Sequence, residues 1–186
     1  MAKVYEFLAD GFEEVEALAP VDIFRRAGVD IETVSVTGSQ IVMSAHNVGI
    51  KADRLFEETD LSDADVLMLP GGLPGATNLN DHEPLKAALK AQAEKGGYVA
   101  AICAAPLVLG GLGLLNGKNA TCYPGFEIYM KGALYTKQLY TIDGNIITGE
   151  GPAASFPYAY AILGLLIGEE NVEPIREGMM YNHLMA

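Results

Sequence analysis

Short apolar runs alternate along this chain with longer segments whose apolar residues recur at helical spacing. The short runs are typical of buried strands in a parallel sheet, and we expect them at residues 3–9, 31–37, 64–69 and 98–102. The longer segments predict helices over residues 12–28, 84–95 and 153–167, and a shorter helix that begins near residues 104–106 and ends at Gly110-Gly111. Because strands and helices alternate, the pattern predicts an α/β fold, with a mostly parallel open sheet covered by helices on both faces.

Two hairpins are predicted beside this alternation. Residues 40–52 form the first, or else a pair of short strands, and turn around His46-Asn47. Residues 139–148 form the second, which turns at Asp143-Gly144. A short strand at 120–122, a helical turn at 125–131 and a short helix after residue 169 complete the prediction. The sequence has no repeat, linker or low-complexity segment, so we expect a single domain over residues 1–186.

Composition and charge exclude several classes of partner. The chain carries 12 basic and 24 acidic residues, a formal net charge of −12, which repels nucleic acid and anionic membranes. The chain has no apolar run of the ~18 residues that a membrane crossing needs, and its first residues lack the apolar core of a signal peptide. We therefore expect a soluble, cytoplasmic protein that binds neither nucleic acid nor membrane.

Cys103 occupies a prominent position in this pattern. It directly follows the apolar run 98–102, and Pro106, a residue favoured in the first turn of a helix, comes three positions later. This arrangement predicts a sharp strand-to-helix turn, the nucleophile elbow, with cysteine as the nucleophile. The helix N-terminus would lower the thiol pKa from about 8.5 to well below 7. The alternative is that Cys103 is only a small buried hydrophobic residue.

Three strand ends are predicted to meet where ligands bind in open α/β sheets, at the carboxyl edge of the sheet. They are residues 10–16, the turn at 70–75 and Cys103. The glycine-rich turn lacks the Lys and Ser/Thr of a phosphate-binding loop. We expect Gly71 to line the site, and a backbone N–H of this turn to form an oxyanion hole together with the N–H of Ala104; the alternative is a plain tight turn.

Glu16 is the candidate proton carrier. Its neighbours on the predicted helix face are apolar, so burial beside a thiolate should raise the pKa of its carboxyl and keep it protonated. Glu13 shares part of this apolar surrounding, and periodicity alone does not choose between the two.

The remaining candidate residues indicate neither a metal site nor a cofactor. His46, His82 and His183 are widely spaced and lie far from either cysteine in the sequence, so we assign them no catalytic role and expect no metal ligands. Cys122 is interpreted as a packing residue, and both thiols are expected to be reduced. Tyr123 offers a hydroxyl that could line the site. The loops lack the aromatic and hydroxyl-rich character of a flavin site.

Five motifs together resemble the ThiJ/PfpI superfamily, in its Parkinson's-associated deglycase (glyoxalase III-like) branch. They occur in the family's order and are residues 10–17, 20–28, 65–72, 100–106 and 148–155. The resemblance implies a flavodoxin-like three-layer sandwich, similar to class I glutamine amidotransferases, and a homodimer with the first helix in its interface. It also implies a reactive Cys103, a protonated Glu16, backbone donors at Gly72 and Ala104, and a Gly151-Pro152 segment near the partner's site.

Three positions depart from the family pattern. Ala104 stands where proteases of the superfamily carry a histidine, so peptidase activity is not expected. Tyr123 stands near the place where the deglycase branch often has a histidine, and His46 stands where the best-known member has an arginine.

The resemblance and the residues support two functions. The first is a cofactor-independent cysteine enzyme in which Cys103, assisted by Glu16, acts on small carbonyl substrates such as methylglyoxal or on early sugar adducts. The alternative is a redox sensor or chaperone-like stress protein that uses oxidation of Cys103.

Overall fold

The computed structural model describes residues 2–184 and centres on a seven-stranded sheet in the order β10-β11-β7-β6-β1-β2-β5. Neighbouring strands are parallel except β10 and β11, which form the predicted hairpin. The strands are β1 (Lys3–Leu8), β2 (Asp30–Ser35), β5 (Arg54–Leu55), β6 (Val66–Leu69), β7 (Tyr98–Ile102), β10 (Tyr140–Asp143) and β11 (Ile146–Gly149). The central strands β6 and β7 are buried, which explains their apolar character; β11 is buried as well but contains Thr148.

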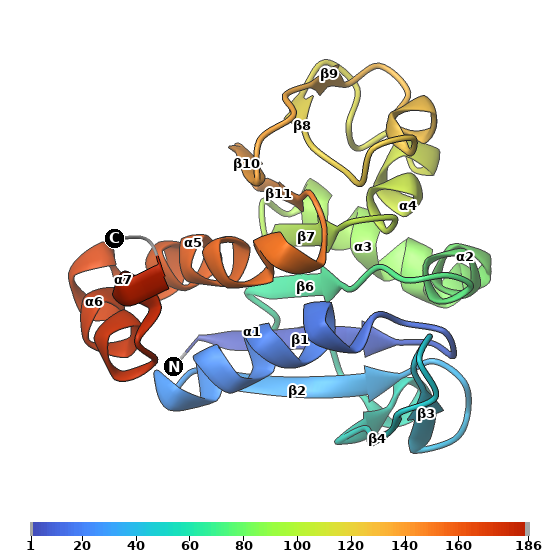
Figure 1. Ribbon diagram of the computed structural model, residues 1–186. Helices are drawn as coiled ribbons and strands as arrows, with labels where there is room; N and C mark the ends of the chain where they lie inside the picture. Colours follow the sequence, from blue (N-terminus) through green and yellow to red (C-terminus); the bar gives the residue numbers. More distant parts are fainter. Residues whose placement is uncertain (1, 185–186) are drawn as a thin grey trace.

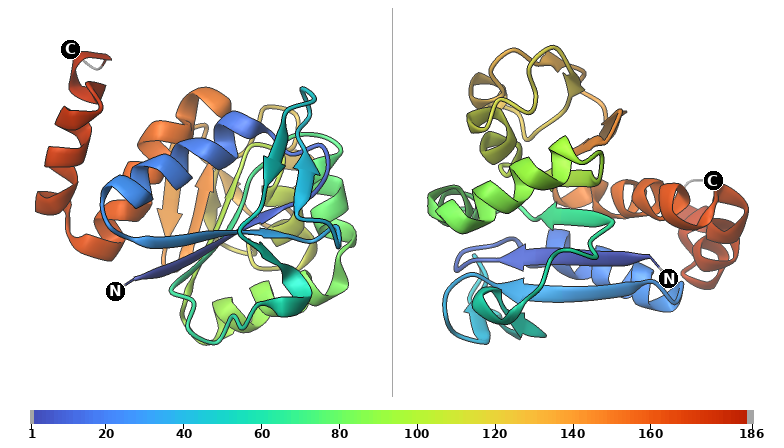
Figure 2. Two further views of the ribbon diagram at one scale, coloured as in Figure 1. Left: turned by 90° about the horizontal axis from the view of Figure 1, so that it is seen from below. Right: turned by 180° about the vertical axis from the view of Figure 1, so that it is seen from behind.

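Helices cover both faces of this sheet. On one face α1 (Glu14–Arg26) and α5 (Ser155–Ile167) lie side by side, and on the other face lie α2 (Gly75–Asp81) and α3 (Glu83–Glu94), with α4 (Pro106–Gly111) beside α2 (Figures 1 and 2). The predicted flavodoxin-like three-layer arrangement is thus confirmed.

Some elements differ from the sequence prediction. The pattern missed α2, because its sequence Gly-Ala-Thr-Asn-Leu-Asn-Asp contains weak helix formers; burial of Ala76 and Leu79 in the core stabilises it instead. The predicted strand 120–122 is only β8 (Asn119–Ala120), which pairs with the unpredicted β9 (Leu134–Tyr135) apart from the main sheet. The predicted helical turn contains one 3₁₀ turn, η2 (Glu127–Tyr129).

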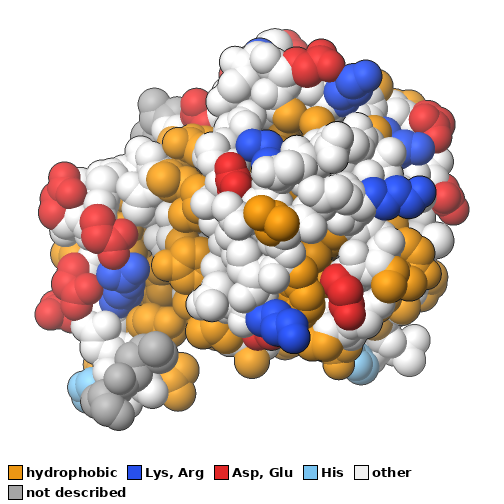
Figure 3. All heavy atoms as spheres, turned by 90° about the horizontal axis from the view of Figure 1, so that it is seen from above, with side chains coloured by type: hydrophobic (Ala, Val, Ile, Leu, Met, Phe, Trp, Pro, Cys, Tyr) orange, Lys and Arg blue, Asp and Glu red, His pale blue; other side chains and the backbone are white. Residues whose placement is uncertain are grey.

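The chain beyond α5 forms two helices, α6 (Glu169–Gly178) and α7 (Tyr181–Leu184), where one short helix was expected. Acidic side chains gather at this end of the molecule (Figure 3). Among the described helices, none combines the length and the apolar character that a membrane crossing requires.

The first predicted hairpin is confirmed as β3 (Ile41–Met43) and β4 (Gly49–Lys51). It lies outside the main sheet, against the loop that joins β1 to α1 (Figures 1 and 2). Two backbone hydrogen bonds hold it there, from Gly11 N–H to the carbonyl of Met43 and from Ala45 N–H to the carbonyl of Phe12. The hairpin therefore borders the carboxyl end of β1.

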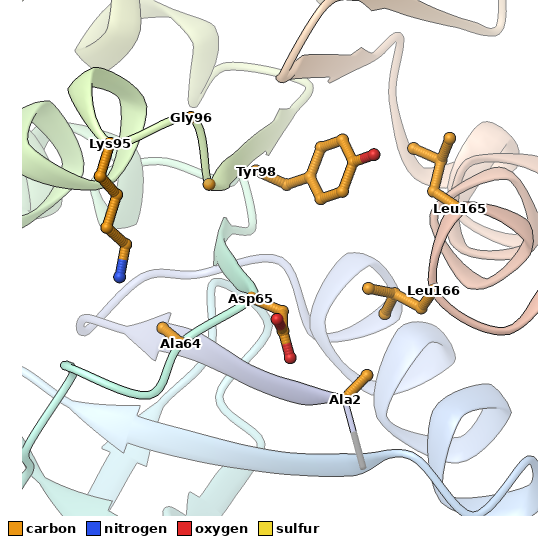
Figure 4. A pocket seen from close by; sticks show the side chains of 9 residues that line it. Ala2, Ala64, Asp65, Lys95, Gly96, Tyr98, Leu165 and Leu166 are labelled. Atoms are coloured by element: carbon orange, nitrogen blue, oxygen red, sulfur yellow. The ribbon is translucent and has the colours of Figure 1, made fainter.

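The two ends of the sheet differ in their chemistry. At the amino ends of β1, β6 and β7, a hollow of about 650 Å³ is lined by side chains that include Asp65, Lys95 and Tyr98 (Figure 4). None of the predicted site residues lines it. They lie at the carboxyl ends, as expected for an open α/β sheet.

Candidate active site

Three segments that are distant in the sequence meet around Gly71, after the carboxyl end of β6. A Cβ atom on Gly71 would lie 2.6 Å from Cβ of Cys103, 2.7 Å from Oε2 of Glu16 and 3.0 Å from the backbone nitrogen of Ala104. Only glycine leaves room for such close approach. The structure thus brings the predicted segments together, and Gly71 is their meeting point.

Cys103 lies on a strained turn between β7 and α4. Its φ angle is +63°, in the left-handed region that residues with a side chain rarely adopt. Two backbone hydrogen bonds of 2.9 Å hold this conformation: Cys103 N–H donates to the carbonyl of Gly149, and Tyr123 N–H donates to the carbonyl of Cys103. The side chain is 8% exposed, and α4 begins at Pro106, so the geometry is that of the predicted elbow.

Opposing influences act on the sulfur of Cys103. Burial and the neighbouring Glu16 carboxylate raise the pKa of the thiol, whereas N–H groups of Gly72 and Ala104 hydrogen-bond the sulfur and lower it. The raising influences dominate, with burial the largest, so the sequence-based prediction of a pKa well below 7 is wrong. The sequence pattern revealed the helix N-terminus but not the burial. A protonated Glu16 would remove the repulsion and could donate to a thiolate.

The structure distinguishes Glu16 from Glu13. The Glu16 side chain is fully buried, its Oε2 accepts from Gly71 N–H at 2.8 Å, and its carboxyl lies beside the Cys103 thiol. Burial raises the pKa of this carboxyl to about 7, against the opposing effect of the bonds to Cys103 and Gly71. Glu13 instead donates its backbone N–H to the Gly71 carbonyl and lies only partly buried. Glu16 therefore contacts the thiol, a choice that periodicity left open.

Tyr123 and Pro152 line one hollow beside Cys103. Its volume is about 430 Å³, and its walls come from residues 123–124 and 150–154. Tyr123 in the first segment donates its N–H to the Cys103 carbonyl, and Gly149, directly before the second segment, accepts from the Cys103 N–H. The Tyr123 side chain is 48% exposed and leaves its hydroxyl available to a bound molecule.

The histidines lie in other surroundings. His46 Nδ1 is 3.0 Å from Glu14 Oε1, and this pairing raises the pKa of His46. The pKa of Glu14 is lowered, against the effect of burial, by a hydrogen bond from its own backbone N–H and then by His46. Together with Glu13, these two side chains place three potential metal-ligand atoms within 4.8 Å of one another. The sequence spacing did not predict this grouping. His82 accepts the Leu85 N–H and so caps α3.

His183 and Cys122 were also expected to take no part in catalysis. His183 is exposed on α7. Cys122 is fully buried with a free thiol, consistent with the packing role and the reduced state expected for it.

Sequence reasoning missed two polar residues near Glu16. Glu6 on β1 and Tyr158 on α5 are each 1% exposed. A charge inside the apolar run 3–9 was the available signal for Glu6. A tyrosine within an apolar helix gave no such signal, because tyrosine packs readily in cores.

Gly71 offers a direct test of this crowded geometry. Replacing it with alanine forces Cys103, Glu16 or Ala104 to move, and we expect a loss of about 1–3 kcal/mol in the free energy of unfolding and a changed rate of Cys103 alkylation. Urea unfolding and iodoacetamide labelling measure the two effects. Gly178→Ala is the matched control, since nothing lies within 4 Å of its added Cβ. Equal results for the two variants would contradict this account of Gly71.

Comparison with known proteins gives a consistent answer. The model of the DJ-1/PfpI family matches residues 2–165. The chain is 38% identical over 167 residues to the zebrafish Parkinson disease protein 7 homolog, covering 88% of each chain. It is 39% identical over 170 residues to Arabidopsis thaliana protein DJ-1 homolog B; this match covers 90% of the chain but spans only 39% of that longer protein.

Solved structures show the same relationship. The structure of oxidized Toxoplasma gondii DJ-1 superposes with a TM-score of 0.93 at 32% identity, over 97% of this chain and 98% of that one. The family model matches most of the chain in sequence, and the superposition shows that the similarity extends to the fold. The chain belongs to the DJ-1/PfpI family.

Proposed function

We propose that this protein is a cofactor-independent cysteine enzyme that converts small 2-oxoaldehydes, such as methylglyoxal, into 2-hydroxy acids. The supporting observation is the contact between the Cys103 thiol, on its strained turn, and the buried Glu16 carboxyl. A carboxyl with a pKa of about 7 can both take and give a proton at neutral pH. Early sugar adducts on amines and thiols also contain an electrophilic carbon that the Cys103 sulfur could attack, so they are further candidate substrates.

The proposed reaction needs no external oxidant. The Cys103 sulfur attacks the aldehyde carbon and forms a hemithioacetal, whose oxygen takes up a proton. Glu16 then removes the proton from that carbon and returns it to the neighbouring carbonyl carbon, while the hydroxyl proton of the hemithioacetal passes to the oxygen of that neighbouring carbon. The first carbon is thereby oxidised to a thioester carbonyl and the second reduced to an alcohol. Water hydrolyses the resulting lactoyl thioester and restores the thiol. The N–H groups of Gly72 and Ala104 are the available donors to oxygen next to the sulfur.

The experiment is to follow lactate formed from methylglyoxal by the purified protein without added cofactor. We expect lactate in proportion to the methylglyoxal consumed. Consumption without lactate would mean simple adduct formation and would contradict the proposal. Peptide hydrolysis is not expected, because Ala104 provides no imidazole next to Cys103.

The family resemblance leads us to propose a homodimer formed through α1. Val15 and Leu18 on this helix are 45% and 37% exposed, apolar side chains that a partner could cover. We expect sedimentation at twice the chain mass, and Val15→Glu should shift it toward the monomer. Sedimentation as a monomer at all concentrations would contradict this expectation.

A second candidate function is oxidation sensing, and the surroundings of Cys103 favour it. Oxidation of the thiol by two equivalents of peroxide gives a sulfinate and two waters. The sulfinate oxygens would meet the N–H groups of Gly72 and Ala104, and a protonated Glu16 could donate to them. Cys122 has no comparable donors and is fully buried.

Mass spectrometry after mild peroxide treatment tests this candidate, with Cys122 as an internal control. We expect two added oxygens on Cys103 well before any modification of Cys122. Equal oxidation of the two cysteines, or none, would argue against a sensing role.

A further inference from the structure

Buried polar atoms without partners concentrate behind the cysteine site. Among residues 2–184, four buried side-chain oxygens have no hydrogen-bond partner. Three of them are Oε2 of Glu6, Oε1 of Glu16 and the Tyr158 hydroxyl. Buried polar groups normally find partners, so three unpartnered oxygens in one region indicate a shared role.

The three side chains come from three elements packed against one another. Glu6 lies within β1, where the neighbouring Tyr5 and Phe7 face the other side: Tyr5 bonds Asp63, and the Phe7 ring lies 6.0 Å from that of Phe56. Because side chains alternate along a strand, Glu6 faces α1 and α5, which carry Glu16 and Tyr158 (Figure 1).

Electrostatics also couples the three groups. Burial raises the pKa of Glu6 well above its usual value, and Glu16 raises it further. Burial likewise raises the pKa of Tyr158, with additional contributions from Glu6 and Glu16. Glu6 is therefore a neutral acid with one O–H donor, and Tyr158 is a neutral phenol that can both accept and donate. Glu16 Oε1 offers an acceptor.

We propose that Glu6 and Tyr158 form a buried hydrogen-bonded relay that ends on Glu16. Glu6 donates to the Tyr158 hydroxyl, and Tyr158 donates to Glu16 Oε1, which gives each unpartnered oxygen a partner. Small side-chain rotations, or one bridging water, close the chain. Glu6 and Tyr158 are positioning residues, since they act through Glu16 and not on the substrate.

The relay would stabilise Glu16 in its ionised form. Gly71 N–H already donates to Oε2, and Tyr158 would add a donor at Oε1. Burial raises the pKa of the carboxyl and favours its protonated form, whereas a donor on each oxygen lowers the pKa and favours the ionised form. The other titratable groups facing Glu16 are Cys103 and Glu13, and both favour its neutral form when they are ionised. This inference rests on the proposed proton transfer by Glu16.

Variants at the two positions give the test. In Tyr158→Phe and Glu6→Leu, Glu16 keeps its proton to higher pH, so lactate formation should fall about 10-fold. The Cys103 thiol then ionises while the neighbouring Glu16 carboxyl is still neutral. The pH midpoint of Cys103 alkylation by iodoacetamide, read by mass spectrometry, should therefore move down by about one unit. Glu6→Gln keeps a donor toward Tyr158 and should recover most of the lost turnover.

The alkylation measurement also separates this inference from the proposed reaction. If wild type makes no lactate, the proposed function fails, yet the downward shift in alkylation midpoint would still support the relay. The same two changes made in a Glu16→Gln background should leave the midpoint where it is. A merely structural role would change the melting temperature without this shift. An unmoved midpoint in both Tyr158→Phe and Glu6→Leu, or an equal shift in the Glu16→Gln background, overturns the relay.

Discussion

Cys103→Ala should abolish lactate formation from methylglyoxal, with a loss of at least ~10³-fold, since removing a covalent nucleophile can lower turnover by as much as ~10⁶-fold. The proposed reaction passes through a bond from sulfur to carbon, and an alanine methyl group cannot form it. The elbow itself should survive the change, because alanine matches the small volume of cysteine. Initial rates of lactate release, with an enzymatic lactate assay, measure the effect.

Cys122→Ala is the matched control for this variant. Both cysteines are buried and both are free thiols, but only Cys103 contacts Glu16 and the backbone donors. Cys122→Ala should retain nearly full activity. If Cys103→Ala keeps the wild-type rate, the thiol is not the nucleophile. If both variants lose activity equally, altered folding is the cause and the assignment of Cys103 fails.

The sequence predicted the arrangement of strands and helices because that depends on periodicity, which it displays directly. It also predicted the convergence of Glu16, Gly71 and Cys103, since parallel strands bring their carboxyl ends to one edge. It did not predict α2, whose weak helix formers are stabilised by contacts with residues distant in the chain.

The electrostatics of the site were less accessible to sequence reasoning. The pKa of Cys103 depends on how deeply the sulfur is buried and on the carboxylate beside it, and neither is encoded within its own strand-to-helix turn. Glu6 and Tyr158 are separated by most of the chain and are brought toward one another because α5 returns across the sheet to lie beside α1. Side-chain type along a single element does not reveal such proximity.

Glu16→Gln should lower lactate formation by about 10²–10⁴-fold, the usual contribution of a positioned acid or base. Glutamine has nearly the same shape, and its carbonyl oxygen can still accept the Gly71 N–H, so the cavity should keep its form. It cannot take up or release a proton, however. Initial rates across the pH range measure the effect: the wild-type profile should show an ionisation near pH 7, and the variant should lack it. An unchanged ionisation in the variant would assign it to another group.

The Glu16→Gln change, which should lower activity, should raise stability relative to wild type as the pH increases. In the folded protein the Glu16 pKa is raised from 4.5 to about 7, so between these values the native state holds a proton that the unfolded state has lost. The favourable contribution of neutral Glu16 is complete below pH 4.5 and is lost as the pH rises through 7. At pH 8 this loss is of the order of 3 kcal/mol in the free energy of unfolding, at about 1.4 kcal/mol per pKa unit.

Glu16→Gln has no proton to lose and should escape this penalty. Relative to wild type, it should therefore gain stability between pH 4 and pH 8, as measured by urea unfolding at both values. Glu6 shows a pKa shift of the same sign, and the part of it caused by burial is common to both proteins, whereas the part caused by the Glu16 charge disappears in the variant. If the stability difference does not change with pH, Glu16 does not titrate with a raised pKa. A variant that is slower but more stable at pH 8 would mean that the fold keeps this carboxyl buried, at the expense of stability, because proton transfer at Cys103 requires it.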